Sequence, residues 1–243
     1  MMKVFVISLT RSDARRAHID EQLRAHTVPY RFFDALDGKA GHKIGFDSFD
    51  ITQFIMRTSR LATPGEIGCF ASHRELWRHC IAINEPILIM EDDFDLTAKF
   101  SSAVAELESL IAHCGFLRLQ TESRGKSVKH IDTGEFSVHF YTKVPHGAAA
   151  YCISPDVAKA FQISSRILTA PVDVFIKSVW EHRQPLFGLR PYTVQPSWMA
   201  RHSTIGARKK MRKDARLRSA RLVEKAREIT RRALFNRGAA ARL

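Results

Sequence analysis

Apolar residues occur along the chain in continuous runs that alternate with segments of helical periodicity. The runs at residues 4–9 and 86–90 are rich in β-branched and aliphatic side chains, which is typical of strands buried on both faces of a sheet. After the first run, residues 13–25 predict a helix and residues 30–35 predict a second strand that ends at Asp37-Gly38. The beginning of the chain is therefore predicted to form a β-α-β unit.

A well-marked helix start is predicted at Thr63. Its hydroxyl can cap the helix, Pro64 suits the first helical position, and Glu66 stands where its side chain can return a hydrogen bond to the capping residue. Apolar residues then recur at helical spacing up to Ile81. The pattern is weak over residues 39–59, where we expect a long loop that covers a site.

The remaining pattern completes an alternation of strands and helices. Further strands are predicted at residues 116–120, 138–142, 147–153 and 186–189, and further helices at 101–113, after Ser154 and over 171–181. This alternation, with continuous apolar strands, predicts an α/β fold with a mostly parallel central sheet. Ligands of such sheets bind beyond the carboxyl ends of the strands. The acidic residues 91–95 follow the run at 86–90 and so are expected at that edge.

The acidic cluster consists of Glu91, Asp92, Asp93 and Asp95. Carboxylates so close together repel one another unless a cation neutralises them, and Mg²⁺ and Mn²⁺ prefer oxygen ligands. The cluster therefore indicates a divalent metal site. The alternative is an exposed turn or helix start with no ligand.

Arginines follow the first predicted strand. Arg11, Arg15 and Arg16 and the amides of the next helix are expected at the same edge of the sheet as the acidic cluster. A carboxylate-bound metal beside these guanidinium groups suits a nucleotide diphosphate. The alternative for Arg15 and Arg16 is an ordinary solvated helix face.

Positive charge is concentrated at one end of the chain. The 243 residues contain 38 Lys and Arg against 25 Asp and Glu, for a net charge of +13, which suggests a polyanionic partner. Residues 207–243 carry +11 of this charge, whereas residues 1–206 are nearly neutral. The chain is therefore expected to consist of a nearly neutral domain over 1–206, which carries the candidate chemistry, and a basic tail over 207–243.

The tail has helical spacing. Leu222, Ala226, Ile229 and Ala233 recur among arginines and predict a basic amphipathic helix suited to an anionic membrane surface. Nucleic-acid binding by phosphate neutralisation is an alternative that the missing aromatic platform disfavours. A third alternative is a helix docked on its own body or on a partner.

The spacing of the cysteines and the hydropathy of the chain indicate the cellular compartment in which the protein is expected. Cys69, Cys80, Cys114 and Cys152 are widely spaced, which indicates neither a structural zinc site nor a disulfide framework and favours a reducing compartment. The run at residues 4–9 is too short for the core of a signal peptide, and no stretch reaches the roughly 18 apolar residues of a membrane-spanning helix. We expect a cytoplasmic protein, peripheral on the membrane.

Several short motifs occur in a fixed order over about residues 3–205. They are Val6-Ile7-Ser8-Leu9 with Arg11, Arg15 and Arg16, Ala35-Leu36-Asp37-Gly38, Thr63-Pro64-Gly65-Glu66-Ile67-Gly68-Cys69 with Ser72-His73, Glu91-Asp92-Asp93, Gly147 with Ala149-Tyr151, and Pro171-Val172-Asp173. With these motifs the chain resembles glycosyltransferase family 25, which includes bacterial lipooligosaccharide β-galactosyltransferases and collagen galactosyltransferase domains.

The resemblance implies a GT-A-like, Rossmann-like fold, a UDP-sugar donor, usually UDP-galactose, a divalent metal such as Mn²⁺ or Mg²⁺, and inversion at the anomeric carbon. Asp93 is the first metal ligand it implies, and Asp95 is a second candidate because Asp93-Phe94-Asp95 is a literal Asp-x-Asp. Glu91 and Asp92 are expected to contact the ribose or a metal-bound water. Which of these carboxylates bind the metal is left open.

Attack by an acceptor hydroxyl requires a base. The candidates are Asp173, then Glu122 and His73. Asp173 has the alternative of a helix cap, and His73 that of a core histidine.

Contacts to the donor are expected from Arg11 and Arg15, and the resemblance adds Thr63, Glu66, His202 and Ser203. A capping box is a sufficient explanation for Thr63 and Glu66, and an exposed loop is the alternative for His202 and Ser203. The predicted function is an inverting, metal-dependent hexosyltransferase at the inner face of a bacterial inner membrane, acting on a lipid-linked oligosaccharide of lipooligosaccharide or lipopolysaccharide. The alternative is a noncatalytic nucleotide- or nucleic-acid-binding module.

Overall fold

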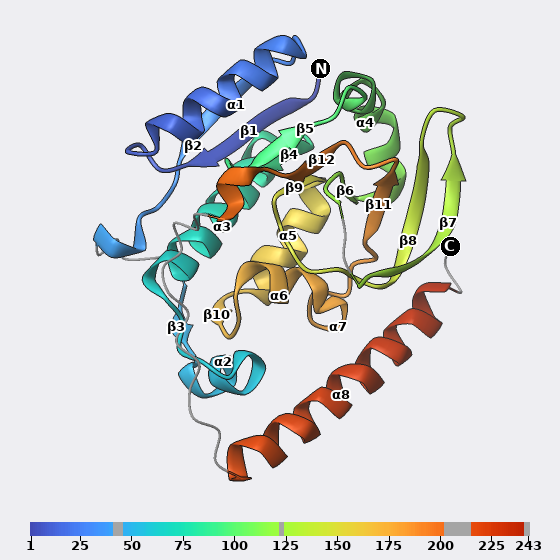
Figure 1. The fold of residues 1–243 in the computed structure, drawn as a ribbon. Coiled ribbons are helices and arrows are strands. Elements are labelled where there is room, and N and C mark those ends of the chain that lie inside the picture. The colour runs from blue at the N-terminus through green and yellow to red at the C-terminus, as the bar shows by residue number, and fades with distance from the viewer. Residues whose placement is uncertain (41–45, 122–123, 202–214, 241–243) are drawn as a thin grey trace.

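A central eight-stranded sheet organises the fold, in the order β2-β1-β4-β9-β6-β11-β8-β7 (Figure 1). The computed structural model describes residues 1–40, 46–121, 124–201 and 215–240. The strands of this sheet are β1 (Lys3–Ser8), β2 (Tyr30–Asp34), β4 (Ile87–Met90), β6 (Phe116–Arg118), β7 (Lys126–Asp132), β8 (Ser137–Lys143), β9 (Ala150–Ile153) and β11 (Phe187–Arg190). Two smaller pairs are β3 (Ser48–Phe49) with β10 (Ile167–Leu168) and β5 (Phe94–Leu96) with β12 (Val194–Pro196).

Helices cover both faces of the sheet, which confirms the predicted α/β class. They are α1 (Asp13–Ala25), α2 (Ile51–Thr58), α3 (Pro64–Ile83), α4 (Phe100–Cys114), α5 (Pro155–Ser164), α6 (Val172–Lys177), α7 (Val179–His182) and α8 (Ala215–Ala240), with 3-10 turns η1 (Gly38–Ala40) and η2 (Trp198–Arg201). No helix in the described ranges combines the length and the apolar character needed to cross a membrane.

The prediction of a mostly parallel sheet was wrong. Parallel pairing joins β1 to β2 and to β4, and β6 to β11, but the other four pairings are antiparallel. Strand β9 lies antiparallel between β4 and β6. All four residues of β9 are buried, so it has the same continuous apolar pattern as a parallel strand, because that pattern reports burial on both faces and not direction.

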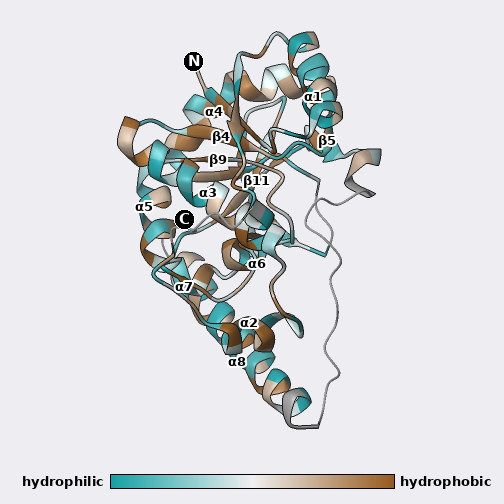
Figure 2. Ribbon diagram, turned by 90° about the vertical axis from the view of Figure 1, so that its left-hand side faces the viewer, coloured by the Kyte–Doolittle hydropathy of each residue, from teal (hydrophilic) through white to brown (hydrophobic). Residues whose placement is uncertain are grey.

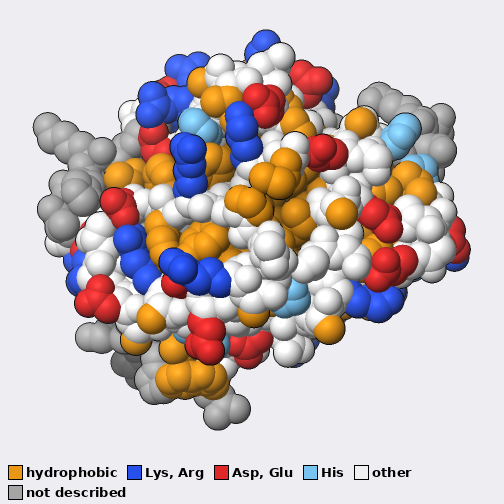
Figure 3. All heavy atoms as spheres, turned by 90° about the horizontal axis from the view of Figure 1, so that it is seen from above, with side chains coloured by type: hydrophobic (Ala, Val, Ile, Leu, Met, Phe, Trp, Pro, Cys, Tyr) orange, Lys and Arg blue, Asp and Glu red, His pale blue; other side chains and the backbone are white. Residues whose placement is uncertain are grey.

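The core has two layers, one on each face of the sheet. In β4, Leu88 and Met90 point into a core shared with α1 and α4, and Ile87 and Ile89 point into a second core shared with α3, α5 and α6. This alternation follows from the two-residue period of a strand. The hydrophobic strands lie inside a more hydrophilic shell of helices (Figure 2). On the face seen in Figure 3, basic and acidic side chains are interspersed around the apolar patches.

Local capping explains where two helices begin. The complete capping box predicted at Thr63 is present at the start of α3. The loop expected over residues 39–59 instead contains α2, which the Asp50 side chain caps by accepting a hydrogen bond from the Gln53 amide. The buried Phe54 anchors this short helix. The helix predicted over 171–181 is divided into α6 and α7 at Ser178.

The C-terminal helix α8 packs against α2 and α7 (Figure 1). Ala239 and Glu224 are buried, Phe235 packs against both cores, and the Asn236 amide donates to the Thr142 carbonyl at 2.8 Å. The apolar stripe predicted from the sequence points elsewhere, since Ile229 is 50% exposed. The helix is therefore docked on its own body and still presents an apolar stripe to the solvent.

We expect His182 to make stability depend on pH. Burial lowers its pKa to about 4, whereas a histidine in an unfolded chain has a pKa of about 6.5. The folded state therefore binds fewer protons, and the free energy of unfolding falls as the pH drops from about 6.5 to about 4, by about 2.5 kcal/mol at pH ~4.5. Urea unfolding at pH ~7.5 and ~4.5 should show this loss in the wild type and not in His182→Gln.

The exposed His113 in α4 provides the matched control. His113→Gln should keep the pH dependence of the wild type. An equal loss of stability in wild type and His182→Gln would contradict the assignment.

Candidate active site

A cavity opens where β1, β2 and β4 end at one edge of the sheet. It is lined by the ends of these strands, the turn before η1 and the first turns of α3; the lining residues are Ile7, Ser8, Leu9, Arg15, Ala35, Leu36, Asp37, Gly38, Gly65, Cys69, Glu91, Asp92 and Asp93. The enclosed part measures about 80 Å³. This is room for an ion and a few ligand atoms, so the rest of a larger ligand would extend beyond the enclosed part. Glu91, Asp92 and Asp93 thus lie at the edge of the sheet where the strand pattern predicted them.

Two glycines permit the close packing that forms one wall of this cavity. A side chain on Gly68 of α3 would come within 2.2 Å of the Leu36 carbonyl oxygen, and one on Gly38 within 1.8 Å of the Pro64 carbonyl oxygen. The Ser72 hydroxyl accepts a hydrogen bond from the Leu36 amide at 2.9 Å. The Gly-Glu-Ile-Gly-Cys motif therefore fixes α3 against the turn before η1 and so shapes the cavity.

Both carboxylate oxygens of Asp92 accept hydrogen bonds from neighbouring side chains. Its Oδ1 accepts a hydrogen bond from Arg15 Nη1 at 2.7 Å, and its Oδ2 accepts one from Ser8 Oγ at 2.6 Å. Arg15 Nη2 also donates to the Met199 carbonyl at 3.2 Å. The Arg15 and Asp92 side chains are each only 11% exposed, so this is a largely buried ion pair. It fixes the guanidinium group at the cavity.

Asp93 is less completely neutralised. Burial, together with the charges of Glu91 and Asp92, raises its pKa to about 7 against the opposing effect of Arg15. Arg15 Nη1 lies 3.8 Å from Asp93 Oδ2, beyond hydrogen-bond distance. A carboxylate held in this way is stabilised by an added cation. The oxygen donors of Asp93 and Glu91 fit Mg²⁺ or Mn²⁺, which retain other positions for water and phosphate.

Asp95 lies apart from Asp93. It belongs to β5, where its Oδ1 is 2.8 Å from His18 Nε2 on α1, and it does not line the cavity. The structure therefore does not bring together the two ends of the literal Asp-x-Asp.

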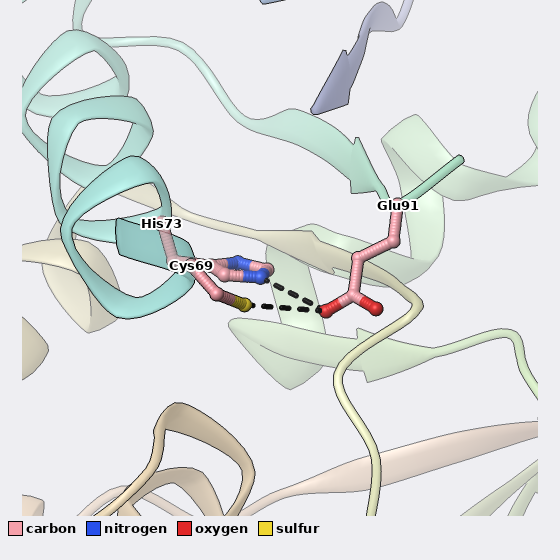
Figure 4. A group of neighbouring side chains, drawn as sticks. All are labelled: Cys69, His73 and Glu91. Carbon is pink, nitrogen blue, oxygen red and sulfur yellow. Dashed lines mark hydrogen bonds and ion pairs between the residues drawn. The ribbon is translucent and has the colours of Figure 1, made fainter. Parts of the chain in front are cut away.

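Glu91 meets two side chains of α3, Cys69 and His73 (Figure 4). Glu91 Oε1 is 3.3 Å from His73 Nε2 and 3.9 Å from Cys69 Sγ, and the three ligand atoms lie within 4.8 Å of one another. Nitrogen and sulfur ligands of this kind suit a transition metal such as Zn²⁺. The widely spaced cysteines gave no sign of this group, because Cys69 and Glu91 are 22 residues apart.

A hydrogen-bond chain leads from the core to Glu91. Trp77 Nε1 donates to the Tyr151 hydroxyl at 2.9 Å, and Tyr151 lies 2.8 Å from His73 Nδ1. Because a carboxylate only accepts, a neutral His73 donates from Nε2 to Glu91 and accepts from Tyr151 at Nδ1. His73 is fully buried and does not line the cavity. The structure thus places it as a core histidine that orients Glu91.

Asp173 has its own pair of partners. His146 Nδ1 donates to Asp173 Oδ2 at 3.2 Å, and Lys177 Nζ donates to His146 Nε2 at 3.1 Å. Burial acts to raise the pKa of Asp173, but the hydrogen bond from His146 and the charge of Lys177 outweigh it and leave the pKa below its usual value. Asp173 is therefore ionised at neutral pH.

Asp173 also lies near the cavity. The pKa of the Cys69 thiol is raised first by burial and then by the charges of Glu91 and Asp173, and Cys69 lines the cavity. Sequence reasoning did not select His146, because a lone histidine in a loop carries no spacing signal; its only indication was the neighbouring Gly147 of the motif.

The remaining predicted residues have other surroundings. Arg11 is 54% exposed and pairs with Asp37, which lines the cavity. Thr63 and Glu66 form the capping box, and the buried Glu66 also pairs with Arg60. Glu122, His202 and Ser203 lie outside the described residues.

Comparisons with known proteins agree on one family. The family model "Glycosyltransferase family 25 (LPS biosynthesis protein)" matches residues 1–176. A lipooligosaccharide biosynthesis protein of Haemophilus influenzae, lic2B, is 31% identical over 177 residues, which cover 67% of this chain and 62% of that protein. The human procollagen galactosyltransferase 2 is 27% identical over 143 residues, 53% of this chain and 23% of the relative. The chain thus spans less than two thirds of these relatives.

We expect Mn²⁺ to stabilise the protein through Asp93. At a concentration about tenfold above Kd, binding to the folded state adds about 1.4 kcal/mol, which corresponds to a rise of about 3–6 °C in Tm for a chain of this length. Asp93→Asn should lose this rise.

Asp95→Asn is the matched control, because Asp95 pairs with His18 away from the cavity. Thermal melts of the three proteins with and without Mn²⁺ check the assignment. A shift retained by Asp93→Asn and lost by Asp95→Asn would reverse it.

Proposed function

We propose that this chain, which belongs to glycosyltransferase family 25, transfers a hexose, most simply galactose from UDP-galactose, to a saccharide of lipooligosaccharide or lipopolysaccharide. The family match confirms the resemblance drawn from the short motifs. The names of the relatives, a lipooligosaccharide biosynthesis protein and a procollagen galactosyltransferase, support this donor and acceptor class. In this proposal the catalytic domain is residues 1–206, with a GT-A-like fold, and residues 207–243 are a tail whose helix α8 packs on that domain.

The observation that carries the proposal is the incompletely neutralised Asp93 beside the fixed Arg15 at the ends of β1 and β4. Asp93, with Glu91, would hold the divalent cation, which when bound stabilises the charge that develops on the leaving diphosphate. Arg15 contributes a second positive charge that the ion pair with Asp92 has already oriented. Arg11 stands at the rim, where it can meet a phosphate.

Asp173 is the proposed base. The acceptor hydroxyl oxygen forms a bond to the anomeric carbon, the bond from that carbon to the diphosphate oxygen breaks, and the hydroxyl proton passes to the Asp173 carboxylate. A single displacement of this kind inverts the anomeric configuration. His146 and Lys177 hold the carboxylate ionised and in one orientation.

We expect Asp173→Asn to lower kcat by about 10²–10⁴-fold and to leave Mn²⁺-dependent binding of UDP unchanged. The matched control is Asp156→Asn, which removes an exposed carboxylate from the equivalent first turn of α5. UDP release measured with UDP-galactose and UDP-glucose, and a panel of glycosides ending in glucose, galactose, heptose or N-acetylglucosamine, identifies the donor and acceptor.

Each outcome of this experiment bears on the proposal. Metal-dependent UDP binding without transfer to any glycoside would support the noncatalytic nucleotide-binding alternative. The absence of UDP binding would remove both.

The tail provides a means of reaching a lipid-linked acceptor. On α8, Leu222, Ile229 and Leu234 are exposed, and Lys225 and Arg237 are exposed among them. An apolar stripe flanked by cations suits the headgroup region of an anionic membrane. The proposed location is the cytoplasmic face of a bacterial inner membrane, bound peripherally.

We expect Ile229→Asp to weaken binding to phosphatidylglycerol-containing vesicles by about tenfold or more, since it removes apolar burial and adds a repelled charge. Val128→Asp is the control, because Val128 is exposed on β7 and lines none of the described cavities to which α8 contributes. Vesicle sedimentation compares the two variants with the wild type. Equal binding by both would exclude α8 as the membrane contact.

A further inference from the structure

A second cavity is lined by residues of α2, α6 and α8, helices that lie on the same side of the central sheet in Figure 1. This groove has a volume of about 750 Å³, within the range typical of small-molecule sites. One wall is formed by Asp173 and Lys177 of α6, and the opposite wall by residues of α8 that include Arg218, Arg221 and Lys225. The groove therefore joins the proposed base to the C-terminal helix.

The groove carries an excess of positive charge. Its lining contains six basic side chains, Arg57, Arg60, Lys177, Arg218, Arg221 and Lys225, and three acidic ones, Asp173, Glu224 and Glu228. Arg57 and Arg60 already pair with Glu181 and Glu66.

The other cations are available to a ligand. Within the described ranges, no ion pair with a carboxylate involves Lys177, Arg218 or Lys225. Lys177 is partly buried, and its ammonium group contacts only the neutral acceptor nitrogen of His146 among the hydrogen bonds described. Burial lowers the pKa of Lys177 despite the opposing charges of Glu228 and Asp173, so an anionic ligand that contacts the ammonium group would be favoured.

The position of the groove identifies its role. The acceptor hydroxyl must reach the base, and Asp173 lines this groove while its charge also acts on Cys69 in the donor cavity. The groove is thus on the acceptor side of the base. Three of its basic residues, Arg218, Arg221 and Lys225, come from α8, which lies beyond residues 1–176, the part matched by the family model.

We propose that this groove binds the acceptor, and that the acceptor is an anionic saccharide whose phosphate or carboxylate lies against Lys177 and the cations of α8. This rests on the proposed transferase function and adds the charge class of the acceptor. The hydroxyl to be glycosylated points toward Asp173, and the anionic group occupies the opposite end, near Arg218 and Lys225.

The test compares disaccharides with and without a phosphate monoester on the reducing sugar. The wild type should use the phosphorylated form with a kcat/KM about tenfold higher, and the preference should fall with added salt. Arg218→Gln with Lys225→Gln should remove the preference by raising KM with kcat unchanged. Lys159→Gln with Arg31→Gln, which removes two exposed cations outside the groove, should keep it.

Calorimetric titration of the phosphorylated disaccharide measures binding without turnover. If binding weakens about tenfold in Arg218→Gln/Lys225→Gln and not in the control variant, the groove binds the anionic saccharide. If the wild type shows this binding but transfers no sugar, the proposed transferase function is wrong and the assignment of the groove still holds. Equal use of both disaccharides by an active wild type, or an undiminished preference in Arg218→Gln/Lys225→Gln, would overturn the inference and leave the transferase function intact.

Discussion

The buried ion pair between Arg15 and Asp92 is the interaction on which the candidate site depends. It ties α1 to the segment after β4, and the same guanidinium group reaches the Met199 carbonyl of η2, while Ser8 at the end of β1 completes the hydrogen bonds to the carboxylate. Breaking such a pair leaves an uncompensated buried charge, which costs about 3–5 kcal/mol. Three segments distant in the sequence are thus held at one edge of the sheet.

The three consecutive acidic residues Glu91, Asp92 and Asp93 have different surroundings and therefore different properties. Asp92 is structural because its oxygens are occupied. Glu91 is oriented from behind by His73, which in turn is held by Tyr151. Asp93 is left partly buried with a raised pKa. Three carboxylates in adjacent positions therefore differ in hydrogen bonding, orientation and pKa because their surroundings differ.

The features of the fold and of the site that short sequence patterns encode could be predicted from the sequence. The helix of residues 13–25, the capping box at Thr63 and the placement of the acidic cluster after a buried strand all follow from short patterns. The direction of β9 could not be predicted, because burial on both faces looks the same in either direction. The contacts of Asp95 and His146 could not be predicted either. Their partners, His18 and Asp173, are 77 and 27 residues away along the chain, and only the tertiary structure brings such residues together.

Helix α8 lies outside the part of the chain that the family model matches, so the two cavities are formed by different parts of the chain. The donor cavity is assembled from β1, β4 and α3, all within residues 1–176, whereas one wall of the groove beside Asp173 comes from a helix appended after them. Under the proposed function, a change confined to that single helix would alter the choice of acceptor and leave the residues around Asp93 and Arg15 unchanged. Acceptor choice and donor binding would then be encoded in separate parts of the chain, so that one could be changed by substitution without the other.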